Sequence, residues 1–243
     1  MYETKGLVLD AFSLGETDKV TCLLTPDHGV IRGIAKGARR LKSRFSGSLE
    51  LFSEVNVGFF KKQDRELVSF SQIELCKSYF HIISLPENFP FFSYFAKVLL
   101  ELVPEWETDD RFYRMVKSCL EGAERYPHRL AEIALYFEFW SLKLAGYMPS
   151  LGSCGICKQK SEVMIGFDIK TIQFVCPACY SSVNLPLGRE GKTLLTLAKK
   201  LPLEDFLVIL KEDDLTDGVS MVREVLGKLL KMVLERELRV EKF

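Results

Sequence analysis

Short segments with alternating apolar and polar positions fill the first 80 residues, and turn residues separate them. In the segment 49–61, one face is polar with Glu50, Glu54 and Asn56, and the other is apolar with Leu49, Leu51, Val55, Val57 and Phe59. A period of two predicts a β-strand that buries one face and exposes the other. Alternation and a high content of β-branched and aromatic residues predict five strands, at residues 5–12, 19–25, 30–36, 49–61 and 66–76.

Five short strands in one small domain leave two exposed edges if the sheet stays open, and exposed edges promote aggregation. A closed Greek-key barrel of the OB type removes this liability. We therefore predict that residues 1–80 form an N-terminal five-stranded OB-type barrel. An open sheet covered by helices is the alternative.

After Pro86 the apolar residues recur at the three- and four-residue spacing of amphipathic helices. This spacing predicts helices over residues 91–102, 128–145, 191–200 and 216–240, and a further helix that Asp109 and Asp110 open. Gly146 is placed to end the helix that precedes it. Residues 81–243 are therefore expected to form a mainly helical domain.

Composition limits the class of protein. The 243 residues are 47% apolar, and 33 basic residues balance 33 acidic ones, so binding to a polyanion requires a local patch. The longest apolar stretches, such as 133–137 and 206–210, are far shorter than the roughly 20 residues of a transmembrane helix. The N-terminus lacks the basic and apolar regions of a secretory signal. We expect a cytoplasmic protein without a membrane segment, whose cysteines are thiols or metal ligands.

Four of the seven cysteines form two C-x-x-C pairs that 18 residues separate, namely Cys154, Cys157, Cys176 and Cys179. This spacing is typical of four-cysteine zinc sites, and an intervening hairpin would bring the pairs together. We predict a structural Zn²⁺ in an excursion at about residues 150–180 of the helical domain. A redox dithiol pair and simple core cysteines are the alternatives. The other three cysteines are expected to be buried apolar residues: Cys22, Cys76 and Cys119.

A basic segment lies between the third and fourth predicted strands. From Arg32 to Arg44 the chain has six basic residues and no acidic one, and small residues such as Gly37 and Gly47 add backbone flexibility and donors. Such a loop can lie along a phosphate backbone, although a solvated loop has the same composition. OB barrels bind nucleic acid with strand faces and adjoining loops, which favours the first interpretation.

Three aromatic residues in and after this segment are candidates for base stacking. Phe45 lies inside the basic segment, which makes it the best of the three. Phe52 and Phe60 are out of phase with the apolar face of the fourth strand, and burial under the helical domain is the favoured alternative for both.

Two kinds of enzyme motif are incomplete or absent in this sequence. Gly191-Lys192-Thr193 resembles the end of a phosphate-binding loop, but Pro186 stands where the motif needs its first glycine. The three histidines occur in neither H-E-x-x-H nor H-x-E. We expect no enzymatic activity; an unrecognised site in a cleft is the remaining alternative.

The basic segment and its surroundings resemble the signature region of the bacterial recombination mediator family RecO. The resemblance is carried by residues 33–40 (GIAKGARR) and 43–52 (SRFSGSLELF), and by the opening segments 6–9 (GLVL), 15–19 (GETDK) and 24–29 (LTPDHG). Total length, the helical second half and the four-cysteine pattern agree with the family. The resemblance covers the whole chain and is most specific in residues 5–52.

The resemblance implies an OB domain and a helical domain with a zinc-binding excursion. RecO proteins bind single- and double-stranded DNA, anneal complementary strands, and with RecR promote RecA loading on DNA coated by single-strand-binding protein, in the cytoplasm and at the nucleoid when bound to DNA. They form and break no bonds. The matching DNA contacts here would be Lys36, Arg39, Arg40, Lys42 and Arg44, and the zinc ligands would be the four cysteines. A protein-interaction module whose basic loop contacts an acidic partner is the alternative.

Overall fold

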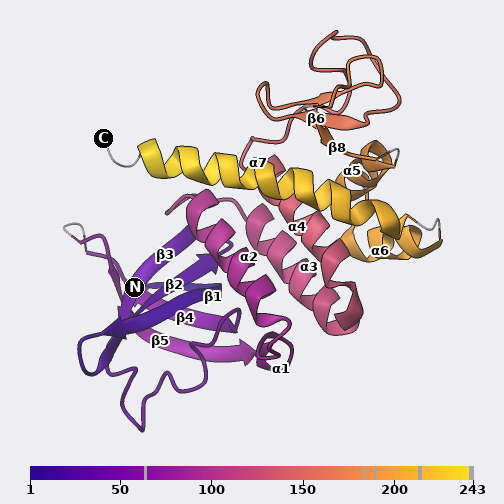
Figure 1. Ribbon diagram of the computed structural model, residues 1–243. Helices are drawn as coiled ribbons and strands as arrows, with labels where there is room; N and C mark the ends of the chain where they lie inside the picture. The colour runs from indigo at the N-terminus through magenta and orange to yellow at the C-terminus, as the bar shows by residue number, and fades with distance from the viewer. Residues whose placement is uncertain (63–64, 183, 189, 213–214, 241–243) are drawn as a thin grey trace. The chain divides into compact units, whose positions relative to one another are not determined.

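The chain folds as two compact units, residues 1–120 and 121–243 (Figure 1). The computed structural model describes residues 1–62, 65–182, 184–188, 190–212 and 215–240, with the backbone alone for 236–240. Each unit has its own hydrophobic interior. The domain boundary at residue 80 stays a prediction.

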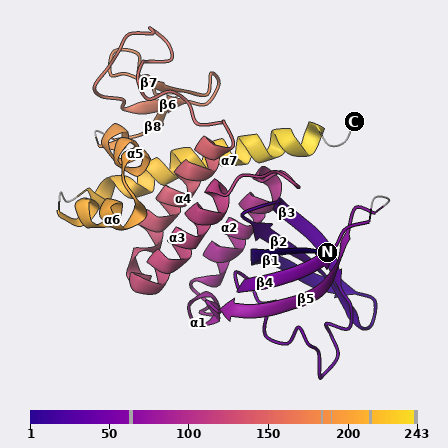
Figure 2. The same cartoon turned by 180° about the vertical axis from the view of Figure 1, so that it is seen from behind.

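The first unit contains a closed barrel of five strands in the order β1-β2-β3-β5-β4. Figures 1 and 2 show its strands from opposite sides: β1 (Tyr2–Leu14), β2 (Asp18–Thr25), β3 (Gly29–Ala35), β4 (Glu54–Phe60) and β5 (Val68–Lys77). Neighbouring strands pair antiparallel except β3 and β5, whose parallel pairing closes the barrel. The predicted five-stranded OB-type barrel is confirmed, and the open sheet is wrong.

A glycine makes the closure between β3 and β5 sterically feasible. Gly33 pairs with Val68, and a Cβ atom at residue 33 would lie only 2.4 Å from Cγ2 of that valine. Any larger residue would push the two strands apart. Glycine in a strand interior often marks such a close approach.

The barrel interior is filled by side chains that alternate along the strands, as the period of two predicts. Val55, Val57 and Phe59 of β4 are at most 2% exposed. Phe45 and Leu49 join them from the segment between β3 and β4. Strand β4 starts at Glu54 and not at residue 49, because residues 49–53 form turns.

Glu54 was expected on the solvent face, and this expectation is wrong. Its residue exposure is 6%, and its Oε1 accepts hydrogen bonds from Lys117 Nζ at 2.9 Å and from the Tyr113 hydroxyl at 3.3 Å. Burial, and then the charge of Glu54, raise the pKa of Tyr113, so the phenol stays protonated and can donate. A buried carboxylate is tolerated here because two donors bind its Oε1.

The segment that follows Leu102 packs against the barrel. Trp106 packs against the barrel core, with its ring 6.1 Å from that of Phe59 and 5.9 Å from that of His28. Gly29 allows this approach, since it has a φ of 58° and a Cβ there would lie 2.3 Å from the Pro104 carbonyl oxygen.

Two helices follow the barrel in the first unit, α1 (Phe80–Ile83) and α2 (Phe89–Leu102), and α3 (Arg111–Arg125) begins there. Helix α2 lies where the apolar spacing predicts it and ends two residues before Pro104. Phe92 on α2 meets Phe52 edge-on, with ring centroids 6.2 Å apart. Helix α2 therefore holds the residues just before β4 in place.

The second unit consists mainly of the helices α4 (Leu130–Leu144), α5 (Gly191–Lys200), α6 (Leu203–Glu212) and α7 (Val219–Val240), with 3₁₀ turns η1 (Pro127–Arg129) and η2 (Thr216–Gly218). Gly146 ends the α4 segment at a φ of 81°, as predicted. Helix α6 was not predicted. Arg223 of α7 pairs with the buried carboxylate of Glu138 on α4 at 3.1 Å.

Within the described parts of the chain, no helix is both long and apolar enough to cross a membrane.

Candidate functional site

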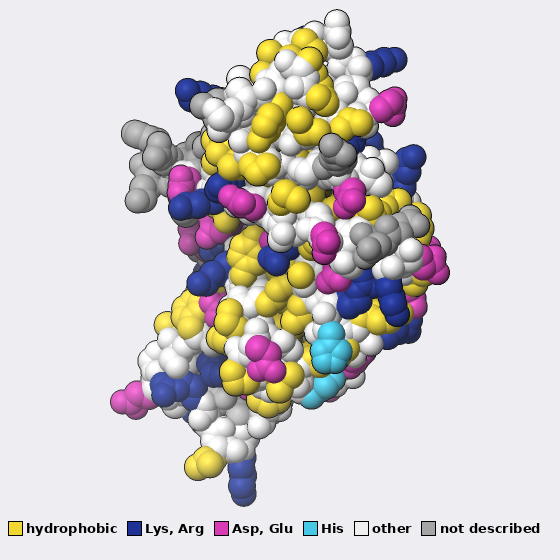
Figure 3. All heavy atoms as spheres, turned by 45° about the vertical axis from the view of Figure 1, so that its right-hand side comes forward, with side chains coloured by type: hydrophobic (Ala, Val, Ile, Leu, Met, Phe, Trp, Pro, Cys, Tyr) yellow, Lys and Arg dark blue, Asp and Glu magenta, His cyan; other side chains and the backbone are white. Residues whose placement is uncertain are grey.

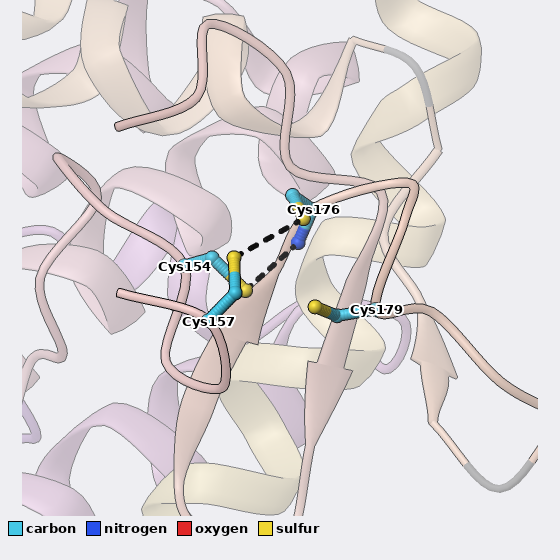
Figure 4. A group of neighbouring side chains, drawn as sticks. All are labelled: Cys154, Cys157, Cys176 and Cys179. Carbon is cyan, nitrogen blue, oxygen red and sulfur yellow. Dashed lines mark hydrogen bonds between the residues drawn. The ribbon is translucent and has the colours of Figure 1, made fainter. Parts of the chain in front are cut away.

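The four predicted ligand cysteines lie together in the second unit (Figure 4). Cys154 and Cys157 belong to a turn before β6 (Gly166–Asp168), and Cys176 follows β7 (Gln173–Val175) directly. Strands β6 and β7 form the predicted hairpin, and β8 (Leu185–Pro186) pairs with the other edge of β6. The first turn is fastened to β7, because the Gly155 N–H donates to the Phe174 carbonyl at 2.8 Å.

The sulfur positions fit a tetrahedral metal ion. All four Sγ atoms lie within 4.8 Å of one another, and those of Cys157 and Cys176 are 3.9 Å apart. A Zn–S bond of about 2.3 Å places the sulfurs of a tetrahedron about 3.8 Å apart. The four side chains therefore surround a space of the size that Zn²⁺ needs.

Backbone donors favour a thiolate within the cluster. Burial raises the pKa of the Cys154 thiol, but the backbone N–H groups of Cys176, Cys157 and Ile156 outweigh burial and lower this pKa to about 6. The pKa of Cys179 rises to about 12, first through burial and then through hydrogen bonds with the other three sulfurs. Binding of a metal ion by cysteine sulfurs releases protons, because the ligating form is the thiolate.

Two residues constrain the backbone of the turn that carries Cys154 and Cys157. At Gly155 a Cβ atom would lie 2.2 Å from Cβ of Gln173, so only glycine lets the turn approach β7. Lys158 has a φ of 63°, and its Nζ donates to Gln173 Oε1 at 3.2 Å. Both residues hold the turn against the hairpin, which fixes the spacing of the sulfurs.

The alternative of a redox dithiol finds less support in the geometry. A redox dithiol needs only two neighbouring sulfurs, whereas here all four sulfurs lie within 4.8 Å of one another. Four sulfurs around one ion would leave no open position for water, as in structural metal sites.

The other three cysteines divide into two cases. Cys22 and Cys119 are buried, as predicted, and burial raises the pKa of Cys22 to about 11 and also raises the pKa of Cys119. Cys76 is exposed, so its predicted burial is wrong. It lies near the end of β5, where the strand runs past the barrel core.

Arg32 belongs to β3, so in the structure the basic segment is the loop of residues 36–53 between β3 and β4. This loop is a series of hydrogen-bonded turns. Each turn is closed by a backbone hydrogen bond to the residue three positions earlier: Ala38 to Ala35, Arg40 to Gly37, Ser43 to Arg40, Ser46 to Ser43, and Ser48 to Phe45. This differs from the loosely held loop that its small residues suggested. The turns fix the backbone positions from which the cationic side chains extend.

The turn between β1 and β2 holds the start of the basic segment. The backbone N–H of Arg39 donates to the Thr17 carbonyl at 2.9 Å, and its Nη1 donates to the Gly15 carbonyl at 2.7 Å. The N–H of Gly37 donates to the carboxylate of Asp18 at 2.8 Å. Arg39 is therefore partly a structural residue.

All five side chains predicted to contact phosphates are exposed: Lys36, Arg39, Arg40, Lys42 and Arg44. Arg32, the sixth cation of the sequence pattern, lies on β3 and pairs with Glu105 at 3.1 Å. Basic and acidic side chains are interspersed over the face drawn in Figure 3. By contrast, residues 32–44 carry six basic side chains and no acidic one, although the whole chain has no net charge.

The three aromatic candidates differ in exposure. Phe45 is 2% exposed and part of the barrel core, so its burial argues against base stacking by its ring. Phe52 is fully buried at a φ of 56°, which agrees with the favoured alternative. Phe60 is 48% exposed, so the alternative of burial is wrong for this residue.

The sequence reasoning missed one residue of the basic segment. Leu41 has a relative exposure of 104%, although it is an apolar residue. The segment has no periodicity that would predict whether a single leucine is buried or exposed. The only sequence signal is that Leu41 lies between two cations, Arg40 and Lys42.

Comparisons with known proteins agree with this architecture. Residues 1–79 match the family model described as recombination protein O N terminal, an OB-fold domain, and residues 87–239 match recombination protein O C terminal. The chain is similar to proteins named "DNA repair protein RecO" from several bacteria. The relative from Dehalococcoides mccartyi is 28% identical over 97% of this chain and 92% of its own. The one from Anaeromyxobacter sp. strain K is 28% identical over 98% and 93%.

A relative from Bifidobacterium adolescentis is 34% identical over 73% of both chains. The two family models together span most of the barrel and of the helical part. The chain therefore belongs to the RecO family of DNA repair and recombination proteins.

Proposed function

We propose that this chain is a recombination mediator that binds single- and double-stranded DNA through its basic segment and catalyses no bond formation. The observation that carries the proposal is the set of five exposed cations on a turn segment that the barrel holds in place. The family's role in DNA repair supports it. Lys36, Arg40, Lys42 and Arg44 are the proposed phosphate contacts, and Arg39 adds charge while it anchors the segment.

Binding by this segment would be electrostatic and independent of sequence. Each cation that neutralises a phosphate releases condensed counterions, so affinity falls as salt concentration rises. If the segment neutralises about four phosphates of a single strand, the logarithm of affinity falls against the logarithm of salt with a slope of about −3. Residues 1–80 carry 12 basic and 10 acidic side chains, so we expect weak binding that a partner strengthens.

Such binding also gives a mechanism for strand annealing. Two complementary strands repel each other because both are polyanions. A protein that neutralises phosphates and leaves base edges free lowers the cost of their encounter. We propose that this chain anneals complementary strands, and that with RecR it promotes RecA loading on DNA coated by single-strand-binding protein. These partners place its activity in the cytoplasm, at the nucleoid when DNA is bound.

We also propose that Cys154, Cys157, Cys176 and Cys179 hold a structural Zn²⁺. The ion would supply folding free energy to the excursion that contains β6 and β7, because four thiolates occupy every coordination position. The sulfur spacing and the lowered pKa of Cys154 support this assignment. The DNA contacts belong to the other unit, so the metal would take no direct part in binding.

The experiment that tests the function measures annealing of complementary oligonucleotides by the purified chain, with and without single-strand-binding protein, and binding across a salt series. Faster annealing and salt-dependent binding are expected. If the chain binds no oligonucleotide at low salt, alone or with RecR, the basic segment has another role. A protein-interaction module that contacts an acidic partner is then the better description.

A further inference from the structure

The tip of the basic segment presents an apolar side chain to solvent. Leu41 and Lys42 are the two central residues of the turn that the Ser43 N–H closes on the Arg40 carbonyl at 2.9 Å. Leu41 has a relative exposure of 104%, whereas the next most exposed large apolar residue that the structure describes, Met1, reaches 67%. The turn therefore holds Leu41 away from all other described side chains.

The base of this tip is fixed to the barrel. Phe45 and Leu49 are buried in the barrel core on one side of the tip, and Arg39 is bonded to the Gly15 carbonyl on the other. The guanidinium of Arg44 lies 4.8 Å from the ring centroid of Phe45. A tip with both sides anchored can present Leu41 in a limited set of positions.

Charge around Leu41 points to the ligand. Single exposed leucines are common on protein surfaces and need no explanation by themselves. Here the residues on both sides are cations, Arg39 and Arg40 before Leu41 and Lys42 and Arg44 after it, all exposed. Cations that follow a phosphate backbone bring the attached bases within reach of the apolar tip. A lipid surface is less suitable, since interfacial binding uses the apolar face of an amphipathic helix.

We propose that Leu41 inserts between neighbouring bases of a single strand that the surrounding cations hold. This inference rests on the proposed function and adds a contact to the base, which the cations do not make. Apolar wedges, leucine among them, enter between base steps in several DNA-binding proteins and partly unstack them. In a duplex each step resists unstacking, whereas the bases of a single strand are less constrained. Leu41 therefore favours single strands over perfect duplexes.

Anisotropy of labelled single-stranded and hairpin-duplex oligonucleotides tests the inference, together with the fluorescence of 2-aminopurine in the single strand. Wild-type protein should increase 2-aminopurine fluorescence, which reports unstacking. Leu41→Ala should weaken single-strand binding about fivefold to tenfold, ~1 to 1.4 kcal/mol, with an unchanged salt slope and unchanged duplex affinity. Leu41→Met should retain wild-type behaviour. Leu75→Ala, at an exposed leucine on β5, is the matched control.

Two results would overturn the wedge while the proposed function stands. One is equal single-strand affinity of wild type and Leu41→Ala. The other is an equal loss on single strand and duplex without any change in 2-aminopurine fluorescence, which would mean that Leu41 acts through the shape of the turn. If the wild-type chain itself shows no salt-dependent binding, the proposed function fails, and the wedge fails with it.

Discussion

The backbone N–H of Gly37 donates a hydrogen bond to the carboxylate of Asp18 at 2.8 Å, which ties the start of the basic segment to the start of β2. This bond, a second one from Thr17, and the charges of Lys36 and Arg40 lower the pKa of Asp18 despite some desolvation. One carboxylate thus anchors the segment and faces two of its cations. Asp18 should therefore control how the segment responds to acid.

Asp18→Asn should lower the stability of the protein slightly at neutral pH. It should also remove the part of the loss of stability in acid that comes from protonation of Asp18. The folded-state pKa lies below the unfolded value, so the contribution of Asp18 is complete above the unfolded value of 3.8. It is lost as pH falls further, through the folded-state pKa. Melting temperatures of both proteins measured from about pH 6 downward should converge at the acid end. The thiols of the cysteine cluster also titrate, but they are common to both proteins, so a constant difference at every pH would contradict the assignment.

Arg40→Gln with Lys42→Gln should weaken oligonucleotide binding through charge alone. Both side chains are exposed, so the melting temperature should stay unchanged. Each phosphate contact on a single strand contributes about −0.7 to the salt slope, so removing two should flatten the slope by about 1.4. Lys97→Gln, an exposed cation on α2, is the control and should leave the slope as it is. An unchanged slope in the double variant would move the DNA site elsewhere.

Local sequence patterns were sufficient for the barrel and for the cysteine cluster. The inward positions of Val55, Val57 and Phe59 on β4 follow from a period of two, and the two C-x-x-C pairs carry their spacing in the sequence itself. The turn residues between strands mark most boundaries to within a few positions. Helix α6 was missed because its apolar residues cluster at 206–210 and were considered only as a short apolar stretch.

Other features depend on residues far apart in the sequence. Glu54 carries a charge and sits at a polar position of the β4 pattern, and its partners Tyr113 and Lys117 are 59 and 63 residues away. Phe45 lies in a run without periodicity, where the path of successive turns decides which side chains enter the core. Only the folded chain shows that Phe45 is an anchor and Leu41 the exposed tip.

Lys117→Met should destabilise the first unit more than Glu54→Gln. Losing Lys117 leaves a buried carboxylate whose remaining described partner is the Tyr113 hydroxyl, and breaking a buried ion pair costs roughly 3–5 kcal/mol. Lys117 is 35% exposed along its side chain, so the lower end of that range is expected. Glu54→Gln keeps an acceptor in place and should cost about 1.5–3 kcal/mol.

A double-mutant cycle checks this pair by denaturant unfolding. The variant with both changes should be more stable than the sum of the single losses predicts, because Lys117→Met no longer leaves an unpaired charge once residue 54 is neutral. Additive losses would mean that the two side chains act independently. Tyr113→Phe removes the second donor, and its smaller effect would rank the two bonds to Glu54.

Metal removal should unfold the cysteine-containing excursion and leave the barrel intact. One equivalent of zinc per chain is expected by elemental analysis, and binding of this kind contributes on the order of 10 kcal/mol of apparent folding free energy. A strong chelator should therefore lower the melting temperature of the second unit, and acid should do the same as the thiolates take up protons. Oligonucleotide binding by the first unit should keep its salt slope.

Cysteine variants separate loss of the metal from loss of a thiol. Cys157→Ser removes one ligand and should abolish zinc binding and lower the melting temperature. Cys76→Ser changes an exposed cysteine outside the cluster and should alter neither. Release of one equivalent of zinc with no change in melting temperature would contradict a structural metal, since folding free energy supplied by the ion must disappear with it. A zinc content that survives Cys157→Ser would instead show that the ion is held by other residues.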